Sequence, residues 1–268
     1  MYRRIVVPVD LDAGAGRSVM VGGVLARQVD AELELLTVVP GGVDLGHLHD
    51  RLAEAAADDA VDAATRVTEA DDVAAAIARE GAEPGSLVCM DTRARRAVTG
   101  MVLGSVSEEV VRELRQPVLL VGPHCATPPR RFESLVVGLD GSELAEQILP
   151  IVVSWTIGFG LTPFLFQVLP ATVPLDLGDD AQDSAYVRRI AEQLAGHGVR
   201  AEWDVVRQQS APEGITSYAA DRRAALIAVT THGRTGLRRV ALGSAASDIT
   251  RRATVPVLVV HPGSTTDA

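Results

Sequence analysis

The sequence repeats itself once over the length of a whole domain. Residues 87–123 match residues 226–262 without a gap, with identical amino acids at twelve of 37 positions. Nearer the start of each half, residues 4–10 correspond to residues 134–140. A repeat of this length indicates two domains in tandem, because solenoid repeats are only about 20 to 50 residues long. Each half must therefore fold around a core of the same kind.

The junction between the copies, residues 122–130, is short and rich in proline, which predicts a stiff connector. We place domain 1 at residues 1–123, the linker at 124–131 and domain 2 at 132–268. The offset between matching residues of the two copies is 130 near their starts and 139 near their ends. A full amphipathic helix is predicted at 179–198, against a shorter one at 48–57. The deletion is therefore expected in the second helix of domain 1.

Apolar runs alternate with helical patterns in both halves. Runs such as 5–7 and 257–260 are apolar at every position, which is typical of parallel strands covered by helices on both faces. The alternation predicts an α/β fold, with two tandem doubly wound parallel five-stranded sheets flanked by helices in a Rossmann-like arrangement. The predicted strands are 4–9, 33–39, 61–68, 86–90 and 117–121, then 134–139, 163–169, 200–207, 225–230 and 256–260. The predicted helices are 15–29, 48–57, 71–80 and 104–115, then 143–157, 180–197, 212–222 and 243–253.

Composition excludes several classes of protein. All 25 basic residues are arginine, so a P-loop, a protein kinase and a pyridoxal Schiff base are excluded for want of lysine. The net charge of −10 argues against binding to nucleic acid or to an anionic membrane. The stretch between Glu146 and Asp176 has no charged residue, but prolines and glycines interrupt it, and we expect buried segments rather than a membrane span. Two cysteines and the lack of a signal-peptide core predict a cytoplasmic protein.

The carboxyl ends of the predicted strands carry the candidate site. Ligands of open parallel sheets bind at this edge. The first strand of each copy ends in Asp10 or Asp140, suited either to accept a hydrogen bond from a ribose hydroxyl or to form a simple turn. The loop after the fourth strand of domain 2 ends in Gly243 and Ser244, where a helix begins. Exposed backbone N–H groups beside a hydroxyl at a helix start favour a phosphate group.

These residues resemble the universal stress protein family. Its nucleotide-binding members carry G-x-x-G, nine further residues and G-[ST] between the fourth strand and the last helix. Domain 2 has TTHG at 230–233, nine residues and Gly-Ser at 243–244, so it departs from the pattern only at the first glycine. Domain 1 has DTRA at 91–94, nine residues and Gly-Ser at 104–105, and it lacks both leading glycines. The likeness extends to the first and last strands and so covers almost the whole chain.

The resemblance implies ATP, with or without Mg²⁺, as the ligand. In domain 2 it implies a site formed by Asp140 for the ribose, Val168 and Val229 for the adenine, and Thr230, Gly233, Gly243 and Ser244 for the phosphates. In domain 1 the corresponding residues are Asp10, Val38, Met90, Asp91, Gly104 and Ser105. Because Asp91 brings a negative charge and Ala94 a methyl group to the phosphate positions, we expect domain 2 to bind ATP more tightly. No catalytic residue and no metal ligand is assigned.

The implied function is a nucleotide-dependent regulatory module of the stress response. The alternative is a nucleotide-independent protein-interaction module of the same fold, with an unknown protein partner. Slow ATP hydrolysis is compatible with the sequence, since arginine can replace lysine electrostatically, but it is not predicted. The family likeness also implies pairing through the last strands, either within one chain or in a homodimer.

One stretch of domain 2 is more apolar than its counterpart in domain 1. Trp155, Ile157, Phe159 and Phe164 correspond to Leu25, Arg27, Val29 and Glu34. This difference predicts either an ordinary core or a surface covered by a partner chain or by the other domain.

Overall fold

The computed structural model describes residues 2–12, 16–58, 61–92, 104–171, 180–231, 242–262 and 264. Its strands are β1 (Arg4–Pro8), β2 (Glu32–Val39), β3 (Ala64–Glu69), β4 (Ser86–Asp91), β5 (Val118–Val121), β6 (Ser134–Leu139), β7 (Thr162–Pro170), β8 (Glu202–Gln208), β9 (Leu226–Thr230) and β10 (Val257–Val260). Its helices are α1 (Arg17–Val29), α2 (Gly46–Asp58), α3 (Val73–Gly81), α4 (Ser105–Glu113), α5 (Glu143–Glu146), α6 (Leu149–Phe159), α7 (Asp180–Gly196), α8 (Ala211–Asp221) and α9 (Ser244–Arg252). Strand and helix alternate in both halves, as the periodicity predicted.

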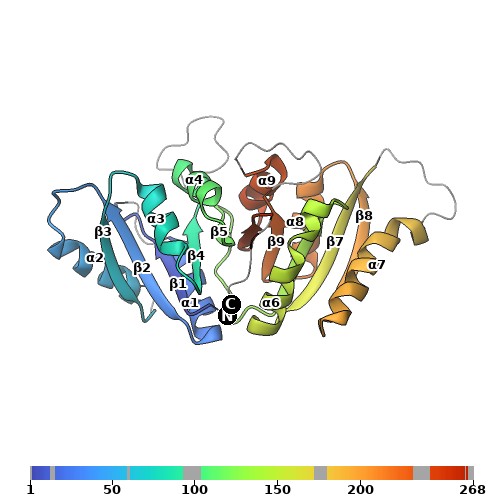
Figure 1. Cartoon of the computed structure of the whole chain (residues 1–268), viewed down its shortest axis with the longest axis horizontal. Helices are drawn as coiled ribbons and strands as arrows, with labels where there is room; N and C mark the ends of the chain where they lie inside the picture. The colour runs from blue at the N-terminus through green and yellow to red at the C-terminus, as the bar shows by residue number, and fades with distance from the viewer. Residues whose placement is uncertain are drawn as a thin grey trace.

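The strands of the two halves join into a single ten-stranded sheet (Figure 1). The strand order is β3-β2-β1-β4-β5-β10-β9-β6-β7-β8. Pairing is parallel within each half, and the strand order reverses beside β1 and β6, which defines a doubly wound sheet. At the centre, β5 and β10 pair antiparallel, with Leu258 opposite Leu119. The expected pairing of the last strands therefore occurs within one chain.

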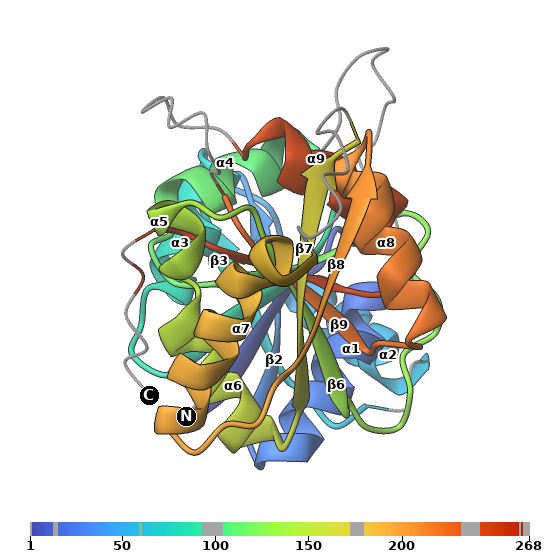
Figure 2. The ribbon, with the colours of Figure 1, turned by 90° about the vertical axis from the view of Figure 1, so that its right-hand side faces the viewer.

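Helices cover both faces of the sheet (Figures 1 and 2). Side chains of α1, α2, α6 and α7 share one apolar cluster with alternate strand residues such as Ile5 and Val7. Side chains of α3, α4, α8 and α9 share the other cluster with intervening residues such as Val6. Because successive strand residues point to opposite faces, a sheet covered on both faces needs apolar residues at every strand position. All three of these side chains are fully buried.

The predicted helix at 143–157 is divided in two, as α5 and α6. Pro150 lies in the first turn of α6, where its missing N–H is tolerated. In a continuous helix, the same ring would clash with the carbonyl of Glu146 and remove a hydrogen bond. The uncharged stretch that follows Glu146 is thus divided between α6 and β7. Among the residues described, no helix is long and apolar enough to cross a membrane.

The second helix differs in length between the halves. Helix α2 has 13 residues and α7 has 17. Strands β2 and β7 begin at Glu32 and Thr162, whereas β3 and β8 begin at Ala64 and Glu202. The additional residues of the second half therefore enter between these strands, in the second helix and its connections.

Domain 1 covers part of the apolar stretch noted in domain 2. The Trp155 ring stacks on Phe159 at 4.6 Å between centroids and meets Tyr2 edge-on at 5.8 Å. Its Nε1 donates a hydrogen bond to the Tyr2 hydroxyl at 3.2 Å. Gln28 of α1 donates to the carbonyl of Phe159 at 2.6 Å. Ile157, on the same helix, is 67% exposed and is not covered in this way.

Candidate functional site

The residues predicted to form the site of domain 2 lie at one edge of the sheet. Val168 is near the end of β7, Val229 and Thr230 end β9, and Asp140 follows β6. Parallel strands bring their carboxyl ends to the same edge, and the strand order reverses here beside β6. The counterparts in domain 1 lie at the ends of β1, β2 and β4. Gly233 and Ala94 lie outside the described residues.

Backbone hydrogen bonds hold each glycine beside the end of a strand. In domain 2 the Thr231 N–H donates to the carbonyl of Val260 at 2.9 Å, and the Gly243 N–H donates to the carbonyl of Thr231 at 2.8 Å. In domain 1 the Gly104 N–H donates to the carbonyl of Thr92 at 3.1 Å. Both ends of the connecting loop are therefore held together at the sheet edge. The Gly-Ser pair reaches the same position in both domains.

Helices α4 and α9 begin without a capping side chain. Gly104 and Gly243 are the N-cap residues, and neither offers a side-chain hydrogen bond to the helix. The first N–H groups of a helix have no intrahelical partner and carry a partial positive charge, so such an end favours an anion. The first turn of α9 contains no acidic residue, whereas that of α4 contains Glu108. The first turn of α9 therefore carries less negative charge than that of α4.

Apolar side chains line the sheet next to these helix starts. Val168 is half-buried and Val229 is 5% exposed, and both belong to the apolar cluster on the α8 face. Gly138 of β6 lets Ile215 and Val229 pack closely against the strand, because a Cβ there would lie 2.9 Å from Ile215 Cδ1 and 3.1 Å from Val229 Cγ1. In domain 1, Val38 is half-buried and Met90 is buried on the corresponding face. Both domains thus have apolar side chains at this edge of the sheet, of which Val168 and Val38 are partly exposed.

The two strand-end aspartates form local turns. Asp140 Oδ1 accepts hydrogen bonds from the Ser142 N–H at 3.0 Å and the Ser142 Oγ at 2.6 Å. Asp10 Oδ1 accepts one from the Asp12 N–H at 3.1 Å. The turn function considered for these residues is therefore present in both domains. It is compatible with a ligand, since a carboxylate has about four acceptor positions.

A polar group beside Asp140 was missed in the sequence. Tyr186 of α7 lies near Asp140, and Arg189 of the same helix has its Nη2 2.6 Å from Oε1 of Glu146, the last residue of α5. Burial raises the pKa of the Tyr186 hydroxyl, and the charges of Glu146 and Asp140 raise it further. Gln167 of β7 is 4% exposed, and its Oε1 accepts no hydrogen bond from the described residues. The tyrosine in an amphipathic helix was the available signal, but its position near Asp140 depends on tertiary packing.

Asp91 distinguishes domain 1 from domain 2. Its Oδ2 accepts hydrogen bonds from the Ser18 Oγ at 2.6 Å and from the Ser18 N–H at 3.2 Å. The carboxylate therefore lies at the beginning of α1, on the edge that carries Gly104. Thr230, which occupies the same position in domain 2, has no charge. Within the part of the chain that the structure describes, no group of three or more histidine, cysteine, aspartate or glutamate side chains is suited to a metal ion.

The fold and this edge define a tandem pair of doubly wound α/β domains with a glycine-serine helix start in each. The model of the universal stress protein family matches residues 1–122 and 131–261. The chain belongs to this family.

Known proteins resemble this chain over most of its length. A universal stress protein of Mycolicibacterium smegmatis is 27% identical over 195 residues, which is 68% of this chain and 64% of that protein. The match thus spans less than two thirds of the relative. A functionally unknown protein from Pseudomonas aeruginosa covers 97% of this chain and 93% of its own, with TM-score 0.70 and 18% identity. A universal stress protein from Archaeoglobus fulgidus covers 98% of this chain and 100% of its own, with TM-score 0.66 and 18% identity. The two structures share the fold.

Two solved universal stress proteins hold nucleotides. One is a complex with cAMP and matches 49% of this chain with TM-score 0.40. The other, from Archaeoglobus fulgidus, is a complex with dAMP and matches 48% with TM-score 0.39. These nucleotides are ligands of those two proteins.

Proposed function

We propose that this chain binds ATP in domain 2 and acts as a nucleotide-dependent regulatory module of the stress response. The observation that supports it most directly is the uncapped start of α9. Gly243 is held at the strand end by its 2.8 Å hydrogen bond to Thr231, and no side chain of the N-cap residue competes for the first N–H groups. A phosphate group is the natural partner of such a helix end.

The proposal gives each residue around α9 a role. The backbone N–H groups at Gly243 and Ser244, with the Ser244 hydroxyl, bind phosphate oxygens. Val168 and Val229 contact the adenine, and Asp140 accepts a hydrogen bond from the ribose. Thr230 and Gly233 complete the phosphate site by family likeness. Mg²⁺ would bind chiefly to the phosphate oxygens and to water, as this ion usually does in nucleotide sites.

Binding, rather than catalysis, is the proposed activity. None of these side chains is assigned as a general base, and the chain contains no lysine to stabilise a transferring phosphoryl group. Cys89 and Cys125 are free and buried, which is consistent with the proposed cytoplasmic location.

Calorimetric titration with ATP and Mg²⁺ tests the proposal. The variant Gly243→Asp, Ser244→Glu places two carboxylates at the start of α9 and should abolish the binding heat. Its matched control, Gly104→Asp, Ser105→Glu, makes the same change in domain 1 and should retain it. Circular dichroism checks that both variants fold. Absence of binding by the unmodified chain, or equal loss in both variants, would reject domain 2 as the site.

The second candidate function is a nucleotide-independent protein-interaction module. Two exposed apolar side chains in domain 2 favour it: Ile157 on α6 is 67% exposed and Trp203 on the edge strand β8 is 40% exposed. If the titration shows no binding, these residues are the first to replace in an assay for a protein partner. A homodimer that buries Ile157 or Trp203 is a separate proposal, because the last strands already pair with each other within the chain.

A further inference from the structure

We propose that Asp91 is an internal anion that occupies the start of α1 and prevents domain 1 from taking a phosphate-bearing ligand. This inference deepens the proposed function and rests on it, because it explains why one repeat binds ATP and the other does not. It assigns that selectivity to a single side chain.

Helix α1 has no cap of its own. Its N-cap residue is Gly16, which makes no side-chain hydrogen bond to the helix. The cap comes instead from Asp91, 73 residues from Ser18 in the sequence, through the hydrogen bonds of 3.2 Å and 2.6 Å to that residue. A carboxylate at this position is stabilised by the unpaired N–H groups and by the partial positive charge of the helix end.

Gly16 is matched to this carboxylate. Its backbone angles, φ −86° and ψ 172°, are open to any residue, so conformation does not require glycine here. The lack of space requires glycine instead, because a Cβ on Gly16 would lie 1.7 Å from Asp91 Oδ2. The carboxylate of Asp91 therefore occupies the space that the side chain of an N-cap residue usually fills, and only glycine at position 16 leaves that space free.

The arrangement lies on the ligand edge of the sheet. Asp91 ends β4 and Thr92 follows it, and the Thr92 carbonyl accepts the hydrogen bond from Gly104 at the start of α4. The carboxylate and the glycine-serine helix start therefore lie at the same edge of the sheet, with the carboxylate on the side of α1. A phosphate bound there would approach a fixed negative charge in a partly buried site, where repulsion is stronger than in water. Asp91 itself is half-buried, and Ser18, which donates both hydrogen bonds, is 1% exposed.

Domain 2 lacks this pair. Thr230 replaces Asp91, and Ile148 replaces Ser18 at the same register of the first helix. The helix start is also rebuilt, because Ser142 caps the short α5 through its hydrogen bond from the Ala145 N–H at 3.1 Å. No carboxylate from β9 is available to mimic a bound anion, and the start of α9 is the position left for a phosphate.

The experiment uses the Gly243→Asp, Ser244→Glu chain, in which the proposed site of domain 2 is removed. Into this background we introduce Asp91→Thr, the residue of domain 2, and separately Asp91→Asn, which keeps an acceptor for Ser18 without the charge. Calorimetric titration with ATP and Mg²⁺ should show binding by both variants, at least about tenfold tighter than by the background itself. Asp91→Asn decides the matter if Asp91→Thr does not fold.

The outcomes separate this inference from the proposed function. Gain of binding in the Asp91 variants supports it, whether or not the unmodified chain binds ATP through domain 2. No gain in either folded variant overturns it, even if domain 2 binds ATP as proposed. If the unmodified chain does not bind ATP, that result rejects the proposed function alone.

Discussion

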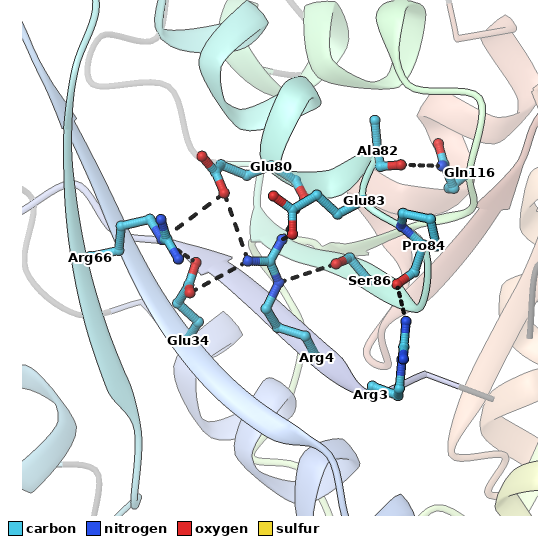
Figure 3. A network of polar contacts seen from close by, with 10 residues as sticks. All are labelled: Arg3, Arg4, Glu34, Arg66, Glu80, Ala82, Glu83, Pro84, Ser86 and Gln116. Atoms are coloured by element: carbon cyan, nitrogen blue, oxygen red, sulfur yellow. Dashed lines mark hydrogen bonds and ion pairs between the residues drawn. The ribbon is translucent and has the colours of Figure 1, made fainter.

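The two domains use different side chains between the sheet and the equivalent helices α3 and α8. In domain 1, Glu34 of β2 is 4% exposed and lies between two arginines, 3.1 Å from Arg66 Nε and 3.6 Å from Arg4 Nη1 (Figure 3). Arg4 also lies 3.7 Å from Glu80 and 2.9 Å from Glu83. Three carboxylates and two guanidinium groups therefore form one network between β1, β2, β3 and the end of α3.

In domain 2 an aromatic cluster stands at this position. Phe164 replaces Glu34, and Arg222 replaces Glu83. The guanidinium of Arg222 lies 5.3 Å from the Phe164 ring centre and 5.2 Å from that of Tyr218, and Tyr218 stacks on Phe166 at 4.0 Å. Removing one member of a buried ion network leaves uncompensated charges, whereas an aromatic cluster loses only contacts. The same fold position thus tolerates either chemistry, but with different sensitivity to substitution.

The largest effect should come from breaking the ion network. Arg4→Met removes the group shared by Glu34, Glu80 and Glu83, and its side chain is only 13% exposed. We expect a loss of about 3–5 kcal/mol in the free energy of unfolding, because Glu83 loses its ion pair and Glu34 and Glu80 keep only Arg66 as a counter-charge. Urea denaturation at pH 7 measures it. The matched change in domain 2, Arg222→Met, breaks exposed ion pairs and should cost about 1 kcal/mol or less. Equal losses would contradict the comparison.

A smaller effect should come from Gly16. The Cβ of Gly16→Ala would meet Asp91 Oδ2 at 1.7 Å, so the carboxylate must leave Ser18. We expect a loss of about 1–2 kcal/mol, the usual cost of losing a helix cap. Thermal unfolding tests this against Gly196→Ala at the end of α7, where no atom lies within 4 Å of the new Cβ. Adding Asp91→Ala to Gly16→Ala should cost little more stability. If the losses of the two single variants add fully in the double variant, the two residues act independently and the prediction is wrong.

The contact between the domains should weaken at alkaline pH. Burial raises the pKa of Tyr2 to about 12 from 10, against a smaller lowering by the hydrogen bond from Trp155. Since the folded state holds the proton more tightly, its stabilisation is complete below pH 10 and is lost as the pH rises from 10 through 12. Unfolding by urea at pH 9 and at pH 11.5 should show a loss about 1–2 kcal/mol larger for the unmodified chain than for Tyr2→Phe. An equal loss of stability in the two chains would contradict this prediction.

The smallest effect should come from Ile157. Its exposed side chain contributes little to the core, so Ile157→Ser should change the free energy of unfolding by about 0.5 kcal/mol or less. Light scattering shows whether the mass in solution changes with it. A lower mass in the variant would reveal that another chain covers this side chain and would favour the interaction alternative.

Local patterns allowed much of the fold to be predicted. The repeat indicated two domains, and the fully apolar strands indicated a parallel sheet covered on both faces. These features follow from hydrophobic periodicity, which each segment carries in its own residues. The glycine-serine helix starts at Gly104 and Gly243 were predicted in the same way. The break before α6 had a local cause in Pro150, but a continuous helix was predicted over 143–157.

The tandem α/β architecture, and the position of the candidate residues near the carboxyl ends of the strands, could be predicted from the order of the amino acids. Three features emerge only in the folded chain: β5 and β10 join the two halves into one sheet, Asp91 caps α1, and Tyr186 lies near Asp140. These contacts join residues far apart along the chain, and they depend on strand register, helix position and side-chain rotamer. No local pattern encodes them, since each segment would show the same periodicity with a different neighbour.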